Sequence, residues 1–154
     1  MERTPKLQLR KVVPLFTLPD KHGQPQNLAR QRGREHLLLI IAQAGVDLKQ
    51  YLSDLEPYTE EWRSLPARGI VVVPDEDAAG ALGAQPFTVL IDANAQASAS
   101  VRSRFLPDDV QIGVFVLDRY GDLYQQWLAT SVAELPSAAD LNGWLQAITM
   151  QCSI

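Results

Sequence analysis

Few side chains in this sequence could carry out chemistry, and the only thiol among them belongs to Cys152. One cysteine in 154 residues cannot form an internal disulfide, which excludes any mechanism that needs two thiols in one chain. A thiol becomes reactive in an ordered, electropositive environment. Cys152 therefore has two interpretations: a peroxidatic or partner-linking cysteine, or an incidental thiol in the C-terminal tail. We favour the second, because Cys152 follows the last predicted helix.

The two histidines and an acidic run are the other candidates for catalysis or metal binding. His22 lies in a Pro-Asp-Lys-His-Gly turn, and His36 stands at the entry to an apolar run. No nucleophile is near either histidine in the sequence, so we interpret both as turn or surface residues. The acids at 75–77 complement the dipole of a helix that begins there, without the ligand spacing of a calcium loop. The sequence therefore predicts neither a metal site nor a cofactor.

The segment 36–62 has the pattern of a strand, a loop and a helix, which is where many α/β proteins bind their ligands. Residues 37–42 are consecutively apolar, as in a central strand covered on both faces. The following loop includes Gln43 and Gly45 but no cysteine, histidine, serine or glycine-rich phosphate cradle. We interpret it as the remnant of an active-site loop, completed by two residues at the start of the helix, Asp47 and Gln50.

The helix after this loop is predicted to begin with a cap and to contain a kink. Asp47 has N-cap chemistry, and Gln50, three positions later, would complete a capping box. Apolar residues then recur at helical spacing as far as Leu65. Pro57 lies inside this pattern and should kink the helix, because proline has no backbone N–H to donate.

The remaining pattern predicts an α/β domain with a mixed sheet. The expected elements are a hairpin around residues 18–25, strands at 69–73 and 112–118, a returning strand at 122–128, an extended piece at 86–91, and helices at 74–84, within 95–105 and at 137–149. The sheet order should be 69–73, 37–42, 112–118, 122–128, with helices on both faces and the last strand antiparallel to its neighbour. This is a thioredoxin-like fold. We expect one domain over residues 1–154, with a loose arm at 1–11, a folded core at 12–150 and a tail at 151–154.

Composition excludes some classes of function. The net charge of −4 argues against nucleic-acid binding, and no apolar segment approaches the length of a membrane span. The sequence begins without an apolar signal core, so a cytoplasmic location is expected. The outer hairpin supplies the best interaction candidates, Tyr120, Tyr124 and Trp127, because an edge strand leaves backbone groups unpaired. A homodimer is a reasonable expectation.

Several strings resemble the peroxiredoxins of the alkyl hydroperoxide reductase / thiol-specific antioxidant family. They are Phe16, Leu18, Pro19, Asp20 and Gly23 followed by Leu28, the run Leu37–Ile41, the run Gly69–Val73, and the run Val114–Leu123. Their order and spacing cover roughly residues 12 to 150. The resemblance implies a thioredoxin-like fold and a peroxide reductase site in the loop after the strand 37–42.

The chemistry departs from the family pattern at that site. The family places a proline, a threonine or serine, and then a cysteine after the strand, and residues 42–50 contain none of them. Its helper arginine would fall at 110–113, whereas Arg102 and Arg104 lie upstream. The resemblance therefore implies the shape of the family without its catalytic set.

Two functions from different classes follow. The first is a non-catalytic thioredoxin-fold protein that binds a protein partner or a small ligand at the remnant loop, or pairs through its edge. The second is a thiol-dependent peroxide reductase that works through Cys152 or through a thiol of its partner. The empty loop favours the first, since a fold by itself does not fix an activity.

Overall fold

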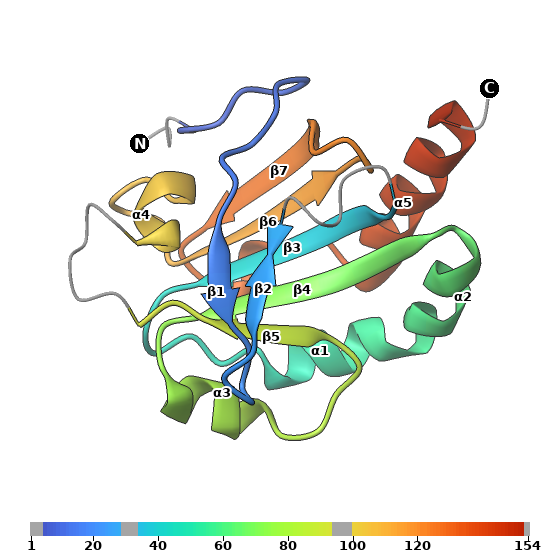
Figure 1. Ribbon diagram of the computed structural model, residues 1–154. Helices are drawn as coiled ribbons and strands as arrows, with labels where there is room; N and C mark the ends of the chain where they lie inside the picture. Colours follow the sequence, from blue (N-terminus) through green and yellow to red (C-terminus); the bar gives the residue numbers. More distant parts are fainter. Residues whose placement is uncertain (1–4, 29–33, 94–99, 153–154) are drawn as a thin grey trace.

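The computed structural model describes residues 5–28, 34–93 and 100–152, and within them five strands form one mixed sheet. The strands are β3 (His36–Ala42), β4 (Ala67–Val73), β5 (Thr88–Ile91), β6 (Ile112–Leu117) and β7 (Leu123–Ala129), in the order β5-β4-β3-β6-β7 (Figure 1). β3, β4 and β5 run parallel, and β6 and β7 are each antiparallel to the strand before them in the sheet. The predicted thioredoxin-like order of four strands is confirmed.

The strand β5 is the part of the sheet that the predicted order lacked. Residues 86–91 were expected to be extended, but they were not assigned to the sheet. Thr88–Ile91 pairs in parallel with the end of β4, and Val89, Leu90 and Ile91 are buried. Four residues are too short a run for periodicity to distinguish a buried strand from a connecting segment.

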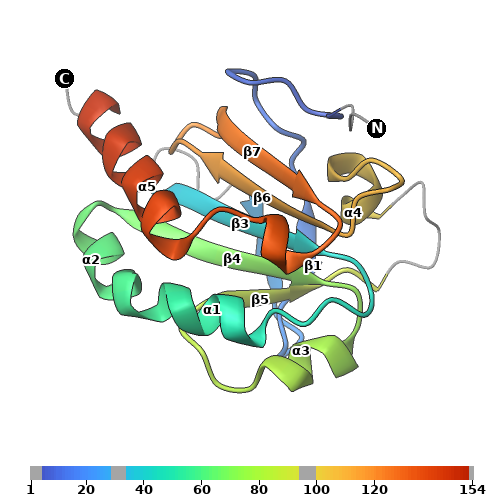
Figure 2. The ribbon, with the colours of Figure 1, turned by 180° about the vertical axis from the view of Figure 1, so that it is seen from behind.

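Both faces of the sheet are covered. Successive side chains of β3 and β6 point to opposite faces, and all of them are buried. Figure 2 shows α1 (Lys49–Leu55), α2 (Thr59–Ser64) and α5 (Ala138–Cys152) on one face. The other face carries α4 (Val101–Phe105) and the hairpin of β1 (Thr17–Pro19) and β2 (Pro25–Asn27) (Figure 1). The prediction of helices on both faces is thus confirmed.

Proline and N-cap residues account for several of the helix boundaries. Between α1 and α2 the chain passes through a 3-10 segment, Glu56–Tyr58, so the single helix with a kink at Pro57 that was expected is divided at that residue into two helices. Asp75 caps α3 (Glu76–Leu82) by accepting a hydrogen bond from the N–H of Ala78 at 2.7 Å. Ser137 caps α5 in the same way through the N–H of Asp140. In the helix expected within 95–105, residues 95–99 lie outside the described residues.

The N-terminal segment differs from the loose arm expected at residues 1–11, of which residues 1–4 lie outside the described part. The N–H of Arg10 donates to the carbonyl of Leu123 at 2.7 Å, and the N–H of Leu123 donates to the carbonyl of Lys11 at 3.0 Å. The arm is therefore paired with the sheet at the start of β7. Its polar composition indicated a solvated segment, but backbone pairing does not depend on side-chain polarity.

In the described part of the chain, no helix combines the length and apolar character that crossing a membrane requires.

Candidate functional site

The remnant loop lies at the carboxyl end of β3, between the central strand and α1. Gly45 has a φ of +84°, which glycine adopts more readily than other residues. The Asp47 carboxylate accepts a hydrogen bond from the N–H of Lys49 at 3.0 Å and so satisfies one free donor at the helix start. The helix itself begins at Lys49, with Leu48 at the N-cap position.

The predicted capping box is wrong. The side-chain amide of Gln50 donates to the Asp54 carboxylate at 2.9 Å and does not reach back to the helix start. Residues four apart are neighbours on a helix surface, so the Gln50 side chain extends along the helix to Asp54, which accepts a hydrogen bond from its amide. Gln50 therefore belongs to the outer face of α1.

Arg102 is brought to this loop from a distant part of the chain. Its Nη1 donates to Oε1 of Gln43 at 3.0 Å, and its Nε lies 3.2 Å from Oδ2 of Asp92. Its Nη2 and its backbone N–H also bond to Asp92, at the carbonyl and at Oδ2 respectively. Asp92 is only 1% exposed, so Arg102 supplies the countercharge of a buried carboxylate.

This contact was missing from the sequence analysis. Arg102 was noted only as lying upstream of the position expected for a helper arginine. Fifty-nine residues separate it from Gln43, and no periodicity connects the two positions. The signal that could have pointed to it is the polar residue Asp92 directly after the apolar run of β5, since a buried carboxylate needs a partner.

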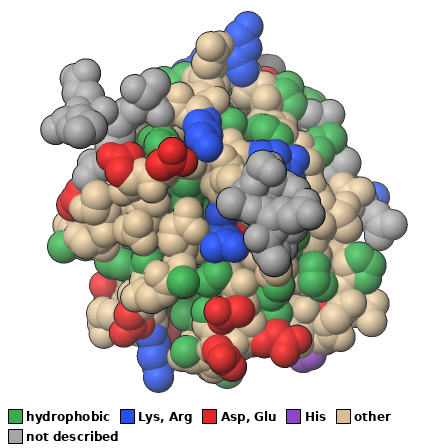
Figure 3. All heavy atoms as spheres, turned by 90° about the vertical axis from the view of Figure 1, so that its left-hand side faces the viewer, with side chains coloured by type: hydrophobic (Ala, Val, Ile, Leu, Met, Phe, Trp, Pro, Cys, Tyr) green, Lys and Arg blue, Asp and Glu red, His purple; other side chains and the backbone are tan. Residues whose placement is uncertain are grey.

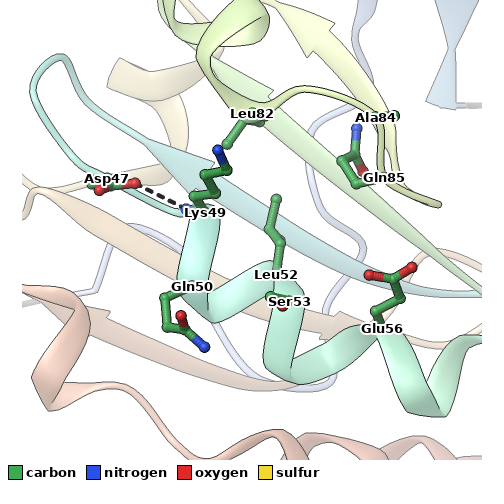
Figure 4. Close-up of a pocket in the computed structure, with 9 residues that line it drawn as sticks. All are labelled: Asp47, Lys49, Gln50, Leu52, Ser53, Glu56, Leu82, Ala84 and Gln85. Carbon is green, nitrogen blue, oxygen red and sulfur yellow. Dashed lines mark hydrogen bonds between the residues drawn. The ribbon is translucent and has the colours of Figure 1, made fainter.

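A groove of about 380 Å³ runs beside this loop, between α1 and the segment that follows α3. Leu52 and Leu82 form part of its apolar wall. Figure 4 shows Lys49 pointing toward Leu82, the last residue of α3, with Asp47 beside it, and Glu56 at the other end, on the side of Gln85. The groove therefore has a mixed lining that is mostly polar, with a lysine and a carboxylate at one end and a second carboxylate at the other.

A second hollow of about 350 Å³ shares Asp47 and Leu82 with this groove and reaches the first turn of α3. Its lining includes two further acids, Asp75 and Asp77. Figure 3 looks onto this end of the molecule and shows acidic side chains over its lower part and basic side chains near its centre. The two hollows together carry more carboxylates than cations, which favours a neutral or cationic ligand over an anionic one.

Neither the hollows nor the rest of the described chain form a metal centre. Among residues 5–28, 34–93 and 100–152, no three side chains of His, Cys, Asp or Glu lie together where they could hold a metal ion. The Tyr51 hydroxyl donates to the carbonyl of Pro136 at 2.7 Å, and burial, helped by the charge of Asp140, raises the pKa of Tyr51. Tyr51 serves as a hydrogen-bond donor that ties α1 to the start of α5.

The structure does not bring Cys152 to the remnant loop. Cys152 lies in the last turn of α5, and α5 begins at the end of the sheet where the loop lies. Figures 1 and 2 show the helix running from there to the opposite end of the molecule. A thiol mechanism at this loop would therefore need a sulfur from another molecule.

The aromatic residues of the outer hairpin have three different environments. Tyr120 is 52% exposed in the turn between β6 and β7. Tyr124 lies under the Arg10 guanidinium, 3.8 Å from its ring centroid. Trp127 packs edge-on against Trp144 of α5, with 6.1 Å between the ring centroids. Of the three, Tyr120 is the most exposed, and its ring faces the Arg119 guanidinium at 5.1 Å from the ring centroid.

Comparison with protein-family models and with curated protein sequences found no match. Solved structures do match. A chain from Chlorobium tepidum assigned as the thiol:disulfide interchange protein DsbE has a TM-score of 0.73 at 19% identity, covering 93% of this chain and 99% of its own. The mitochondrial 2-Cys peroxiredoxin from Plasmodium falciparum has a TM-score of 0.73 at 14% identity, covering 95% and 96%. AhpC from Enterococcus faecalis has a TM-score of 0.72 at 15% identity, covering 94% and 94%.

These similarities extend over almost the whole of each chain, and at such identities they establish the fold. The expected resemblance to peroxiredoxins is confirmed at that level, together with a similarity to a thiol:disulfide interchange protein. The single cysteine of the sequence lies far from the loop that follows β3. The chain thus has the thioredoxin-like fold that peroxiredoxins share, with no cysteine at the position where that family carries its reactive thiol.

Proposed function

We propose that this protein is a non-catalytic binding module that uses the remnant loop and the adjacent groove to hold a protein partner or a small ligand. The observation that carries the proposal is that the Arg102 guanidinium already has partners within the protein. Its guanidinium is bonded to Asp92 and Gln43, so its charge is neutralised beside a loop that contains no sulfur. A low-pKa thiolate needs an available positive charge nearby.

The groove supports binding rather than catalysis. Its ends carry Lys49 and Glu56, and neither side chain is engaged by another side chain in the described part of the chain. Leu52 and Leu82 supply apolar surface between them. The lysine and the two carboxylates that converge on the groove could fix the orientation of a polar ligand or of a peptide.

Peroxide consumption tests the non-catalytic half of the proposal. Hydrogen peroxide and an organic hydroperoxide would each be mixed with a dithiol reductant, with and without the protein. We expect the wild-type protein and Cys152→Ser to consume peroxide no faster than the reductant alone. Turnover that disappears in Cys152→Ser would favour the alternative, a thiol-dependent peroxide reductase.

Affinity capture tests the binding half. Asp47→Lys reverses a charge between the two hollows, and Glu60→Lys makes the same change at an exposed position on α2. We expect a bound component to be lost from Asp47→Lys and kept by Glu60→Lys. Equal capture by both variants would remove the groove as the binding site.

A further inference from the structure

A groove of about 420 Å³ lies between the last strand and the last helix, and we call it the tryptophan groove. It shares no residue with the two hollows beside the remnant loop. Trp127 of β7 and Trp144 of α5 supply its aromatic wall. The other residues that line it are Pro136, Ala139, Asp140, Gly143 and Ala147. Figure 2 looks onto the face of the sheet that α5 covers.

The two indole rings of this groove form a corner. Their planes lie at 72° to each other, with 6.1 Å between the ring centroids. Both side chains are half-buried, so part of each indole stays open to solvent. The faces of an indole carry negative electrostatic potential and attract cations more strongly than those of any other aromatic side chain. The aromatic wall therefore favours a positively charged ligand.

The charge of the groove points to the same class of ligand. Among the described residues that line the groove, Asp140 is the only one with a charged side chain. Its carboxylate is exposed and, within the described chain, forms no ion pair. A carboxylate beside two indoles attracts a cation and repels an anion.

The groove is poor in hydrogen-bond acceptors, which decides the kind of cation. A primary ammonium brings three N–H donors, and each needs an acceptor when it leaves water. The carboxylate of Asp140 is the only side-chain acceptor in the lining, and the carbonyl of Pro136 already accepts the hydroxyl of Tyr51. A quaternary ammonium has no N–H, and its methyl groups suit the apolar remainder of the lining.

Gly143 keeps the floor of the groove open. A glycine inside a helix costs stability relative to alanine, and Gly143 lies in the middle of α5. A Cβ at this position would meet no atom within 4 Å, so the packing of the chain itself does not require a glycine here. The absence of a side chain leaves room for a ligand against the helix.

We propose that the tryptophan groove binds a small organic cation that carries a quaternary ammonium group. The ammonium would contact the indoles of Trp127 and Trp144, and Asp140 would supply the countercharge. The volume of the groove is in the range of small-molecule sites. The site is independent of the function proposed for the remnant loop, because the two have no residue in common.

NMR of the indole N–H groups during a titration with choline tests the proposal. The chain has three tryptophans, and the third, Trp62, bonds to Asn142 in the interior, so its signal serves as an internal reference. We expect choline to shift the signals of Trp127 and Trp144 saturably and to leave that of Trp62 in place.

Two further ligands separate charge from shape. The neutral isostere of choline, with carbon in place of the charged nitrogen, should bind about tenfold more weakly, because it loses the attraction to the rings and the carboxylate. Ethanolamine keeps the charge without the methyl groups. It should also bind more weakly, since its N–H groups leave water without finding enough acceptors.

Two substitutions locate the site. Asp140→Asn should weaken choline binding about threefold, whereas Glu60→Gln, the same change at an exposed position on α2, should not alter it. Gly143→Leu fills the floor of the groove and should abolish the saturable shift. Leucine is a good helix former, so the Trp62 signal should stay in place and show that this variant is folded.

Four results would overturn the proposal: no saturable shift at either indole, equal binding of the neutral isostere or of ethanolamine, equal weakening by Asp140→Asn and Glu60→Gln, or full binding by Gly143→Leu. If Gly143→Leu fails to fold, Ala147→Leu replaces it, since Ala147 lines the groove from an exposed position one turn further along α5. Weaker choline binding is expected from it, and an unchanged affinity would equally contradict the site.

Discussion

Nη1 of Arg102 lies 3.0 Å from Oε1 of Gln43, and this bond joins α4 to the loop that follows the central strand. The same guanidinium neutralises the buried Asp92. Arg102→Ala should therefore lower the free energy of unfolding by about 3–5 kcal/mol, because it leaves a buried carboxylate without its countercharge. Gln43→Ala removes one hydrogen bond and should cost about 1 kcal/mol. Urea denaturation measures both, and an equal or reversed order would contradict the assigned roles.

The indole Nε1 of Trp62 donates to Oδ1 of Asn142 at 2.8 Å in the interior, and this bond ties α2 to α5. Asn142→Leu should lower the free energy of unfolding by about 1–3 kcal/mol, since it leaves a buried donor unpaired. In the background of Trp62→Phe, which has no N–H, the same substitution should cost less. A double-mutant cycle with thermal or urea denaturation gives the coupling, and a coupling free energy near zero would mean that the bond adds nothing to stability.

The central strands and most helix boundaries could be predicted from the sequence because their signals are local. The uninterrupted apolar run of β3, the proline in the helix after it and the serine that caps α5 each act within one or two turns of chain. The capping box at Gln50 failed for a local reason as well, since the Gln50 side chain bonds to Asp54 one turn further along the helix and does not reach back to the helix start.

The candidate site could be predicted only in part, because its key contact is not local. Asp47 and Gln43 follow from their place after β3, but the position of Arg102 depends on how α4 docks against the sheet. The pairing of the N-terminal arm with the start of β7 was missed for a similar reason. Its bonds are made by backbone groups, which every sequence supplies equally.

Gly69 of β4 lies directly under an aromatic pair. The rings of Trp62 and Phe87 stack edge-on with centroids 6.1 Å apart, and a Cβ at position 69 would collide with the Phe87 ring. Gly69→Ala should therefore destabilise the protein by about 1–3 kcal/mol, because the ring must move within a close-packed core. Gly143→Ala is the control: it lies in α5, with no atoms near a new Cβ, and should stabilise the helix by about 0.5–1 kcal/mol. Thermal denaturation would reveal the opposite signs, and two shifts of the same sign would contradict this account of Gly69.

His36, only 2% exposed at the start of β3, should make stability depend on pH. Its Nδ1 accepts the N–H of Arg119 at 3.1 Å and must be unprotonated to do so. Burial lowers the pKa of His36 from its ordinary value of 6.5, and the nearby Arg119 adds to this, while Asp118 opposes it.

A histidine whose pKa is lowered by folding takes up its proton more readily in the unfolded chain. As the pH falls through 6.5 toward the folded-state pKa, the unfolded state is therefore favoured, and stability decreases. The slope from one such group cannot exceed about 1.4 kcal/mol per pH unit. His36→Asn keeps an acceptor for Arg119 but cannot be protonated, so it should flatten the dependence between about pH 5.5 and 7.5, a window set by the ordinary pKa. Urea denaturation across this range measures the wild type and His36→Asn, and an unaltered slope in His36→Asn would show that another group is responsible.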